Sequence, residues 1–265
     1  MISNNQTHTH PLYLTGWNEF DKFYITLNGS DTNGSLYLVS TPIGNLEDIS
    51  MRAIRILGSV DIVAAEDTRR TGLLLSHYNI KKRLESYHDH NKARKTPFLL
   101  QQLSEGRSIA VVSDAGTPGI SDPAYYLVRR AIDIGISPVP VPGATAAVAG
   151  LVASGLPTDR FVFEGFLPHK KGRHTKLQQL AEEPRTIVLY ESPHRLIKTL
   201  SEILDTLGNR SIAVCRELTK KFEEIVRGTV SEVIEAFSQK PIRGEFVLII
   251  EGKTKHHDKK TRSEK

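Results

Sequence analysis

Four short segments of this 265-residue chain combine the residue types that bind small ligands: glycine, proline, hydroxyl-bearing residues and carboxylates. They are TPIGN at 41–45, EDTRR at 66–70, SDAGTPG at 113–119 and PGATA at 142–146, and each directly follows a short apolar run. Backbone amides at glycine turns bind anionic groups, while a carboxylate such as Asp114 accepts hydrogen bonds from ammonium or hydroxyl groups. We therefore predict a ligand pocket. For 113–119, a tight turn that needs glycine only for its positive φ is the alternative.

The apolar run before each segment predicts a strand of a parallel sheet. Ile109–Val112 is short and apolar, as is typical of a strand buried on both faces, and Ser121-Asp122-Pro123 is a capping signature for the helix that follows. The predicted strands of the first half span 36–40, 61–65, 84–87, 109–112 and 139–142. Helices are predicted between them, including one at 93–103 that Pro97 interrupts near its start and an Ala-rich one ending at Ser154. Carboxyl ends of parallel strands share one edge of a sheet, so the four segments should converge.

The second half has a different pattern after a predicted linker at 156–159. Its predicted strands span 161–166, 186–192, 211–215, 223–228 and 245–252. Two of them follow each other without a helix, which favours a mixed sheet. We predict an α/β protein of two domains, a parallel doubly wound domain at 35–155 and a mixed-sheet domain at 156–252. A polar extension at 1–34 and a basic tail at 253–265 flank them.

Composition excludes several classes of protein. The single cysteine, Cys215, rules out an intramolecular disulfide or a multi-cysteine metal site and suits a reducing compartment. No apolar run approaches the roughly 20 residues of a membrane span, and the N-terminus has no secretory signal, so we expect a cytoplasmic protein. The sequence lacks GxGxxG, GxxxxGK[ST], GxSxG and HExxH, so nucleotide, hydrolase and metal sites of those types are unsupported and we expect no metal.

Positive charge gathers in three places. The tail 253–265 has six basic and two acidic residues, and it accounts for most of the net charge of +5. Two internal clusters, 81–95 and 168–176, are also basic, and the first interleaves Tyr and His with its cations. Solvated surface is the simpler interpretation of each cluster. The occurrence of two favours a polyanionic partner such as RNA.

Eight segments resemble one known family in order and spacing. They are LYLVSTPIGNLEDIS, AAEDTRRTG, VVSDAGTPGISDP, VPVPGATA, GLPTDRFVFEGFLPHKKGR, VLYESPHRL, CRELTKKFEE and GEFVLIIEG, and they cover 35–252. They are similar to the bacterial ribosomal RNA small subunit methyltransferase I family of the tetrapyrrole methylase superfamily. The resemblance implies S-adenosylmethionine-dependent methylation of the ribose 2′-hydroxyl of a cytidine in the decoding region of 16S rRNA. It also implies a homodimer that acts on the assembled small ribosomal subunit.

The resemblance further implies that S-adenosylmethionine binds in a cleft between the domains. The cofactor-binding residues implied are Pro42, Gly44, Asp114, Ala115, Gly116, Thr117, Pro142, Gly143, Thr145, Ala146, Tyr190, Gly244 and Glu245.

Catalysis requires alignment of donor and acceptor, and help in deprotonating a weakly nucleophilic hydroxyl. Glu66, Asp67 and Arg69 are the catalytic candidates, because they are charged groups at a strand end beside the predicted cleft. A helix N-cap paired with a neighbouring arginine is the alternative for the two acids. The candidates for binding RNA phosphates are His88, Lys92, Arg94, Lys170, Lys171 and Arg173.

The chain departs from the family pattern at both ends. Residues 1–34 precede the first motif, and thirteen mostly polar residues follow GEFVLIIEG where relatives continue with a helical segment. A methylase of the same fold acting on a tetrapyrrole or other small acceptor is the competing hypothesis. TPIGNLED in place of a GxGPG-like loop, together with EDTRR and FLPHKKGR, favours RNA. An RNA-binding scaffold without activity is the third hypothesis, and the intact loops oppose it.

Overall fold

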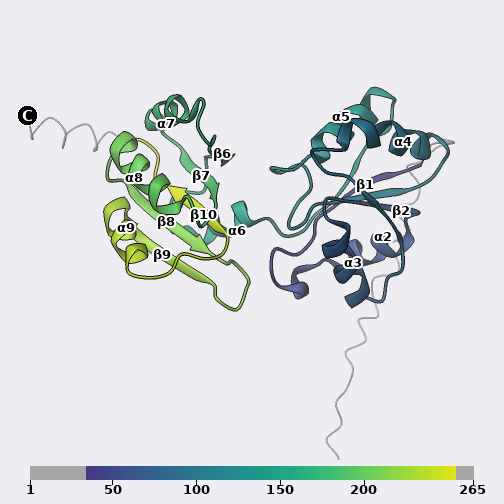
Figure 1. Cartoon of the computed structure of the whole chain (residues 1–265), viewed down its shortest axis with the longest axis horizontal. Coiled ribbons are helices and arrows are strands. Elements are labelled where there is room, and N and C mark those ends of the chain that lie inside the picture. The colour runs from purple at the N-terminus through teal and green to yellow at the C-terminus, as the bar shows by residue number, and fades with distance from the viewer. Residues whose placement is uncertain (1–33, 255–265) are drawn as a thin grey trace, which may run out of the picture.

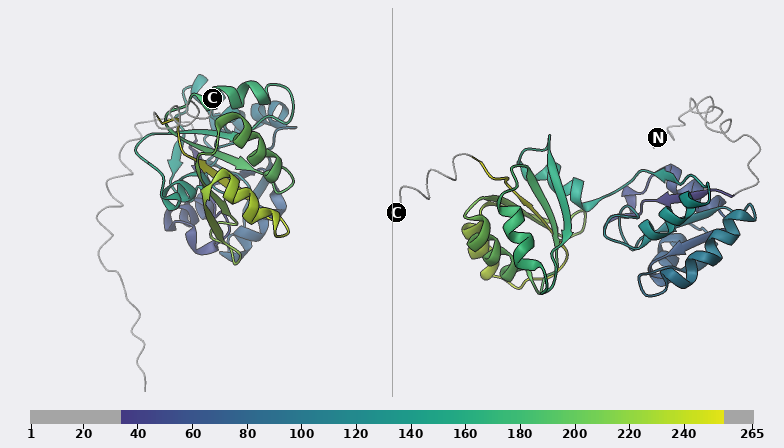
Figure 2. Two further views of the ribbon diagram at one scale, coloured as in Figure 1. Left: turned by 90° about the vertical axis from the view of Figure 1, so that its left-hand side faces the viewer. Right: turned by 90° about the horizontal axis from the view of Figure 1, so that it is seen from above.

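The computed structural model describes residues 34–254, which form two α/β units side by side joined near α6 (Figures 1 and 2). All but residue 34 of the predicted extension, and all but residues 253 and 254 of the predicted basic tail, therefore lie outside the described residues. The first unit contains a five-stranded sheet in the order β3-β2-β4-β1-β5, parallel throughout. Its strands are β1 (Leu36–Val39), β2 (Ile62–Ala65), β3 (Arg83–Ser86), β4 (Ile109–Val112) and β5 (Val139–Val141).

Helices cover both faces of this sheet, which confirms the predicted doubly wound arrangement. They are the short η1 (Leu46–Asp48), α2 (Met51–Ser59), α3 (Thr68–His77), α4 (Lys92–Ser104) and α5 (Ala124–Asp133). One apolar cluster lies beneath α4 and α5 and the other beneath α2 and α3. The central β2 and β4 are buried along their whole length, because side chains on both of their faces enter these clusters. α4 runs from Lys92 to Ser104 with Pro97 inside it, so the predicted interruption is not observed, although proline removes a backbone donor and crowds the preceding turn.

The second unit contains a mixed sheet, as predicted, in the order β6-β7-β10-β8-β9. The strands are β6 (Phe161–Phe166), β7 (Thr186–Glu191), β8 (Ser211–Arg216), β9 (Glu224–Thr229) and β10 (Phe246–Ile250). β6 and β7 are parallel, and the remaining pairs are antiparallel. One face packs on α7 (Arg173–Ala181), α8 (Leu196–Leu207) and α9 (Val230–Ser238). No helix among residues 34–254 is long and apolar enough to cross a membrane.

Helix α6 (Ala146–Ser154) covers the other face of the second sheet and contacts β7, β8 and β10. The predicted boundary after Gly155 instead grouped this helix with the first sheet. Gly150 permits the observed packing, because a Cβ atom there would lie 3.1 Å from Cδ1 of Ile249 and 3.3 Å from Cγ1 of Val247. The packing therefore assigns α6 to the second sheet, although its N-terminus lies in a loop of the first.

A buried polar network fixes the end of β7 against α7 and α8. Glu191 is 2% exposed and accepts a 2.6 Å hydrogen bond from the Thr199 hydroxyl, which also accepts from Arg173 at 2.7 Å. Arg173 also donates to Glu202 at 2.6 Å and to the Pro168 carbonyl at 3.1 Å. A buried cation with several acceptors satisfies its hydrogen bonds without water. The network thus holds both the strand end and the loop that precedes α7.

We predict that Arg173→Ala lowers the free energy of unfolding by about 3 kcal/mol, because it leaves a partly buried carboxylate and hydroxyl without their donor. Urea denaturation measures this change. Lys198→Ala is the matched control, since Lys198 faces the same Glu202 from 3.9 Å with its side chain 69% exposed. Equal stability of the two variants would contradict the structural role of Arg173.

Candidate active site

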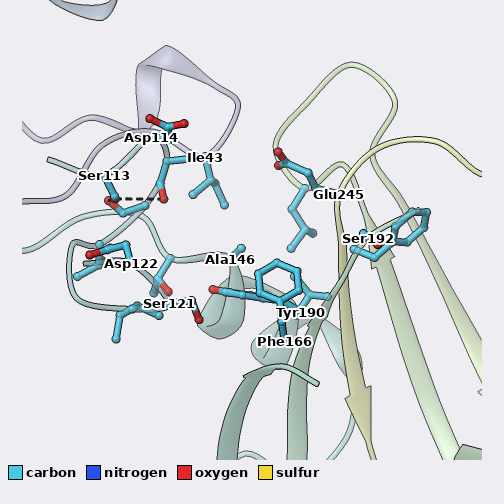
Figure 3. Close-up of a pocket in the computed structure, with 18 of the residues that line it drawn as sticks. Ile43, Ser113, Asp114, Ser121, Asp122, Ala146, Phe166, Tyr190, Ser192 and Glu245 are labelled. Atoms are coloured by element: carbon cyan, nitrogen blue, oxygen red, sulfur yellow. Dashed lines mark hydrogen bonds between the residues drawn. The ribbon is translucent and has the colours of Figure 1, made fainter. Parts of the chain in front are cut away.

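A cavity of about 330 Å³ opens between the two sheets and is lined by residues of both (Figure 3). The first unit contributes the loops after β1, β2, β4 and β5. The second contributes the ends of β6 and β7, the loop after β8 and the start of β10. The volume lies within the usual range for small-ligand sites. The lining residues are Ile43, Glu66, Arg70, Ser113–Thr117, Ile120–Asp122, Thr145, Ala146, Phe166, Tyr190–Pro193, Leu218 and Gly244–Val247.

Hydrogen bonds tie the loops of the first sheet together. Thr41 and Gly116 exchange backbone hydrogen bonds of 2.9 and 3.0 Å, which joins the loop after β1 to the loop after β4. The Thr117 hydroxyl donates to the Ala144 carbonyl at 3.1 Å, which joins in the loop after β5. Gly116 has φ +86°, a left-handed conformation that favours glycine. The predicted convergence of these loops is therefore observed.

Tyr190 closes the cavity from the second sheet. Its hydroxyl accepts a 3.2 Å hydrogen bond from the backbone amide of Ala147 in the first turn of α6. Its ring contacts those of Phe163 and Phe166, with centroids 5.1 and 5.6 Å apart. Figure 3 shows Tyr190 and Phe166 beside Ala146, where the loop after β5 enters α6. The two units thus meet through a helix start and an aromatic group.

Within residues 34–254, five acidic side chains and one basic side chain, Arg70, line the cavity. The acids are Glu66, Asp114, Asp122, Glu191 and Glu245. Burial raises the pKa of Glu66, and the nearby carboxylates of Asp114 and Asp122 add to this shift. Burial likewise raises the pKa of Asp122. Asp114 pairs with Arg70 at 3.4 Å, Glu245 with Lys220 at 3.0 Å and Glu191 with Arg195 at 3.3 Å. Glu66 and Asp122 accept from backbone amides instead, so among the described acids these two carboxylates are the ones left to meet a positive centre of a ligand.

The side chains that line the cavity fit S-adenosylmethionine, which has a sulfonium, an ammonium and an aromatic base. The carboxylates suit the two cations, and apolar side chains such as Ile43 and Leu218 suit the base. Among the described residues, no group of three His, Cys, Asp or Glu side chains could hold a metal ion.

Most of the residues predicted for the cofactor line this one cavity. They are Asp114, Ala115, Gly116, Thr117, Thr145, Ala146, Tyr190, Gly244 and Glu245. Pro42 and Gly44 instead line a neighbouring depression of about 280 Å³, which shares Arg70, Ser113 and Asp114 with the main cavity. Pro142 and Gly143 do not line the cavity. Gly143 allows the loop after β5 to lie close to Ser40 at the end of β1, because a Cβ atom at position 143 would lie 2.7 Å from Cβ of Ser40.

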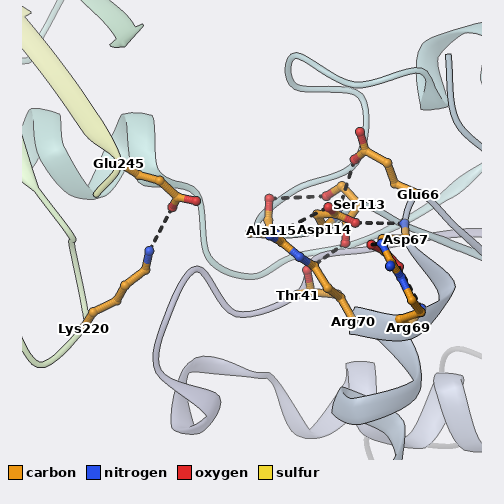
Figure 4. A network of polar contacts seen from close by, with 10 residues as sticks. All are labelled: Thr41, Glu66, Asp67, Arg69, Arg70, Ser113, Asp114, Ala115, Lys220 and Glu245. Atoms are coloured by element: carbon orange, nitrogen blue, oxygen red, sulfur yellow. Dashed lines mark hydrogen bonds and ion pairs between the residues drawn. The ribbon is translucent and has the colours of Figure 1, made fainter. Parts of the chain in front are cut away.

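The three predicted catalytic residues occupy different environments. Glu66 lines the cavity, and it accepts from the Asp114 amide at 3.4 Å (Figure 4). Asp67 is the N-cap of α3, and its carboxylate accepts from the amide and the side chain of Arg69 at 2.7–3.1 Å. These bonds hold the pKa of Asp67 well below its usual range. The alternative interpretation as a paired helix cap therefore describes Asp67 and Arg69, and neither lines the cavity.

The residues predicted to bind RNA lie in two places and differ in exposure. Lys170 and Lys171 are exposed in the loop before α7. At the start of α4, Arg94 is exposed, while Lys92 is half-buried and pairs with Asp89 at 2.7 Å. His88 lies just before α4 and contacts Asn91 through Nε2 at 3.2 Å. Arg173 is 6% exposed and donates to Glu202, the Pro168 carbonyl and Thr199. The prediction that it binds RNA therefore does not fit its position.

Sequence reasoning missed several lining residues, notably Arg70, Asp122, Phe166 and Glu191. Arg70 and Asp122 both lie in motifs that the sequence makes visible. In EDTRR the prediction selects Arg69, and for Asp122 it is a helix-capping role. Nothing in the spacing of FVFEGF indicates that its last phenylalanine faces the cavity.

Residues 35–234 match the family described as Tetrapyrrole (Corrin/Porphyrin) Methylases. Ribosomal RNA small subunit methyltransferase I of Halalkalibacterium halodurans is 54% identical over 223 residues, covering 84% of this chain and 77% of that relative. The protein of the same name from Pasteurella multocida is 54% identical over 230 residues, covering 85% and 82%.

Among solved structures, the uroporphyrin-III C-methyl transferase of Thermus thermophilus complexed with S-adenyl homocysteine superposes with a TM-score of 0.59. The match covers 82% of this chain and 97% of that one at 22% identity, and it shows a shared fold. Together, the family match and the close relatives show that this chain belongs to the tetrapyrrole methylase family and, within it, to the ribosomal RNA small subunit methyltransferase I group.

Proposed function

We propose that this protein transfers the methyl group of S-adenosylmethionine to the ribose 2′-hydroxyl of a cytidine in the decoding region of 16S rRNA. The observation that carries the proposal is the cavity between the two sheets, lined by loops of both, in a chain half identical to proteins named for methylation of small-subunit rRNA. The choice of cytidine, 2′-oxygen and decoding region rests on the motif resemblance. We expect the assembled subunit to be the substrate and a cytoplasmic homodimer to be the enzyme.

The cavity offers distinct groups to each part of the cofactor. Asp114–Thr117, Thr145 and Ala146 would hold its amino-acid and ribose groups, and Tyr190, Gly244 and Glu245 would close the site from the second sheet. When bound, S-adenosylmethionine supplies a methyl group activated by its sulfonium. The protein then has to align an oxygen nucleophile with that methyl group and to exclude water.

Glu66 is the candidate general base among the acids of the cavity. It lies at the carboxyl end of β2 and lines the cavity, whereas the carboxylate of the adjacent Asp67 is occupied by Arg69. A carboxylate of raised pKa accepts a proton more readily than an ordinary one near neutral pH. The hydroxyl proton would pass to Glu66 as the ribose oxygen attacks.

The experiment that tests the function is methyl transfer from radiolabelled S-adenosylmethionine into small ribosomal subunits from cells lacking the protein. We expect label in one nucleoside, 2′-O-methylcytidine, from the decoding region. Label elsewhere in the 16S rRNA would correct the target. If the protein binds cofactor but labels no RNA, a small-acceptor methylase replaces the proposal.

Asp114→Ala should weaken cofactor binding by about 10- to 100-fold, because a charged acceptor lining the cavity is lost. Isothermal titration with S-adenosylmethionine measures the change. Asp133→Ala is the matched control, since Asp133 lies at the end of α5 and pairs with Arg129. Unchanged affinity in the Asp114 variant would remove this residue from the cofactor site.

Glu66→Gln should slow methyl transfer by about a hundredfold at neutral pH and abolish the acidic limb of the pH–rate profile. The wild-type rate should rise with pH through the raised pKa of Glu66, because only the ionised carboxylate accepts a proton. Single-turnover transfer over a pH series measures both effects.

Stability provides the control for the Glu66 variant. Because folding raises the pKa of Glu66, its contribution to stability is present at low pH and is lost as pH rises through the folded-state pKa. The uncharged glutamine should therefore not lower the unfolding temperature at neutral pH. Asp67→Ala should show the opposite pattern, with reduced stability and nearly normal transfer. Slow methyl transfer in Asp67→Ala together with normal transfer in Glu66→Gln would assign the general base to Asp67 instead of Glu66.

A further inference from the structure

Phe166 exposes its ring at the wall of the cavity. The side chain is 55% exposed, although it lies at the end of a strand and lines the cavity beside Tyr190 (Figure 3). An exposed aromatic ring in water forgoes hydrophobic burial and is common where a partner later covers it.

A bulge in β6 gives the ring this position. The pairing of β6 with β7 shifts between Phe163 and Gly165, so Glu164 is the extra residue and Phe166 pairs with Tyr190. Gly165 has φ +62°, and a Cβ atom there would lie 2.9 Å from the Ser121 hydroxyl in the loop after β4. Side chains of a strand alternate between faces, and a bulge changes which face the following residue occupies. Here it brings both Phe163 and Phe166 against the Tyr190 ring.

The chain that follows Phe166 provides positive charge within five residues of it along the sequence. Lys170 and Lys171 are exposed, while Arg173 anchors the same loop by donating to the Pro168 carbonyl at 3.1 Å. Inside the cavity, Glu66 and Asp122 are the acids for which the described residues show no cationic partner, and their carboxylates disfavour a phosphate there. A nucleotide at this edge is therefore best placed with its phosphate on the exposed lysines and its base against the ring.

We propose that Phe166 is a stacking platform for an unpaired base of the RNA substrate, next to a phosphate-binding loop formed by Lys170 and Lys171. The inference rests on the proposed function and adds to it the surface that seats the acceptor strand. Bases stack on aromatic side chains with little regard to sequence, so Phe166 positions the strand and leaves the choice of site to other contacts.

The test compares three full-length variants: Phe166→Ala, Phe166→Tyr and Phe161→Ala. Phe161 is the matched control, because it is the same residue type at the other end of the same strand, is 40% exposed and does not line the cavity. The measurements are the KM for small subunits, the Kd for S-adenosylmethionine, and quenching of 2-aminopurine in a short single-stranded RNA, which reports stacking.

Phe166→Ala should raise the KM for RNA about tenfold and lose the quenching, with the cofactor Kd unchanged. Phe166→Tyr should restore both properties, and Phe161→Ala should match the wild type. A wild-type KM and wild-type quenching in Phe166→Ala would overturn the inference. A weaker cofactor Kd with unchanged RNA values would overturn it too and assign the ring to the cofactor. If the wild type labels no RNA, the proposed function fails, and quenching still decides the role of Phe166.

Discussion

Reciprocal backbone hydrogen bonds between Thr41 and Gly116 hold the binding edge of the first sheet together. β1 lies between β4 and β5, so the loop after β1 can pair with the loop after β4 while Thr117 reaches the loop after β5. Backbone groups that bond one another leave side chains such as Asp114 and Thr145 to face the cavity. A ligand site at this edge depends on these hydrogen bonds more than on any single side chain.

Helix α6 connects the loops at this edge of the first sheet to the second sheet. It begins in the loop after β5, and its Ala147 amide donates to the Tyr190 hydroxyl. The close approach at Gly150 then packs the helix on β10, and Ile43 from the loop after β1 joins the same apolar cluster. Because one helix and one apolar cluster connect the two units, the cavity has walls from both.

The helices and strands of this fold can be predicted from local sequence, but the direction of some side chains cannot. Strand runs such as Ile109–Val112, and the helices between them, follow from apolar patterning and capping residues, and the structure confirms them. Asp67 and Glu66 are neighbours of identical charge, yet one caps α3 and the other faces the cavity. Only the packing of α3 and the position of Asp114 distinguish them. Arg173 looks like one more cation of a basic cluster until Glu202 and Thr199, distant in sequence, bury it.

Charge is divided between the interior of the site and its edge. Inside, the carboxylates of Glu66 and Asp122 favour a cationic donor and disfavour phosphate, since cations pair with the other acids of the wall. The exposed lysines of the loop before α7 have the opposite preference. A polyanionic acceptor would therefore remain outside except for the one nucleotide that enters. Phe166 lines the cavity and directly precedes that loop in the chain, at the end of a strand whose bulge sets its direction. A small, highly carboxylated acceptor would have to lie among the acids of the wall, which is why this distribution of charge favours RNA over a tetrapyrrole.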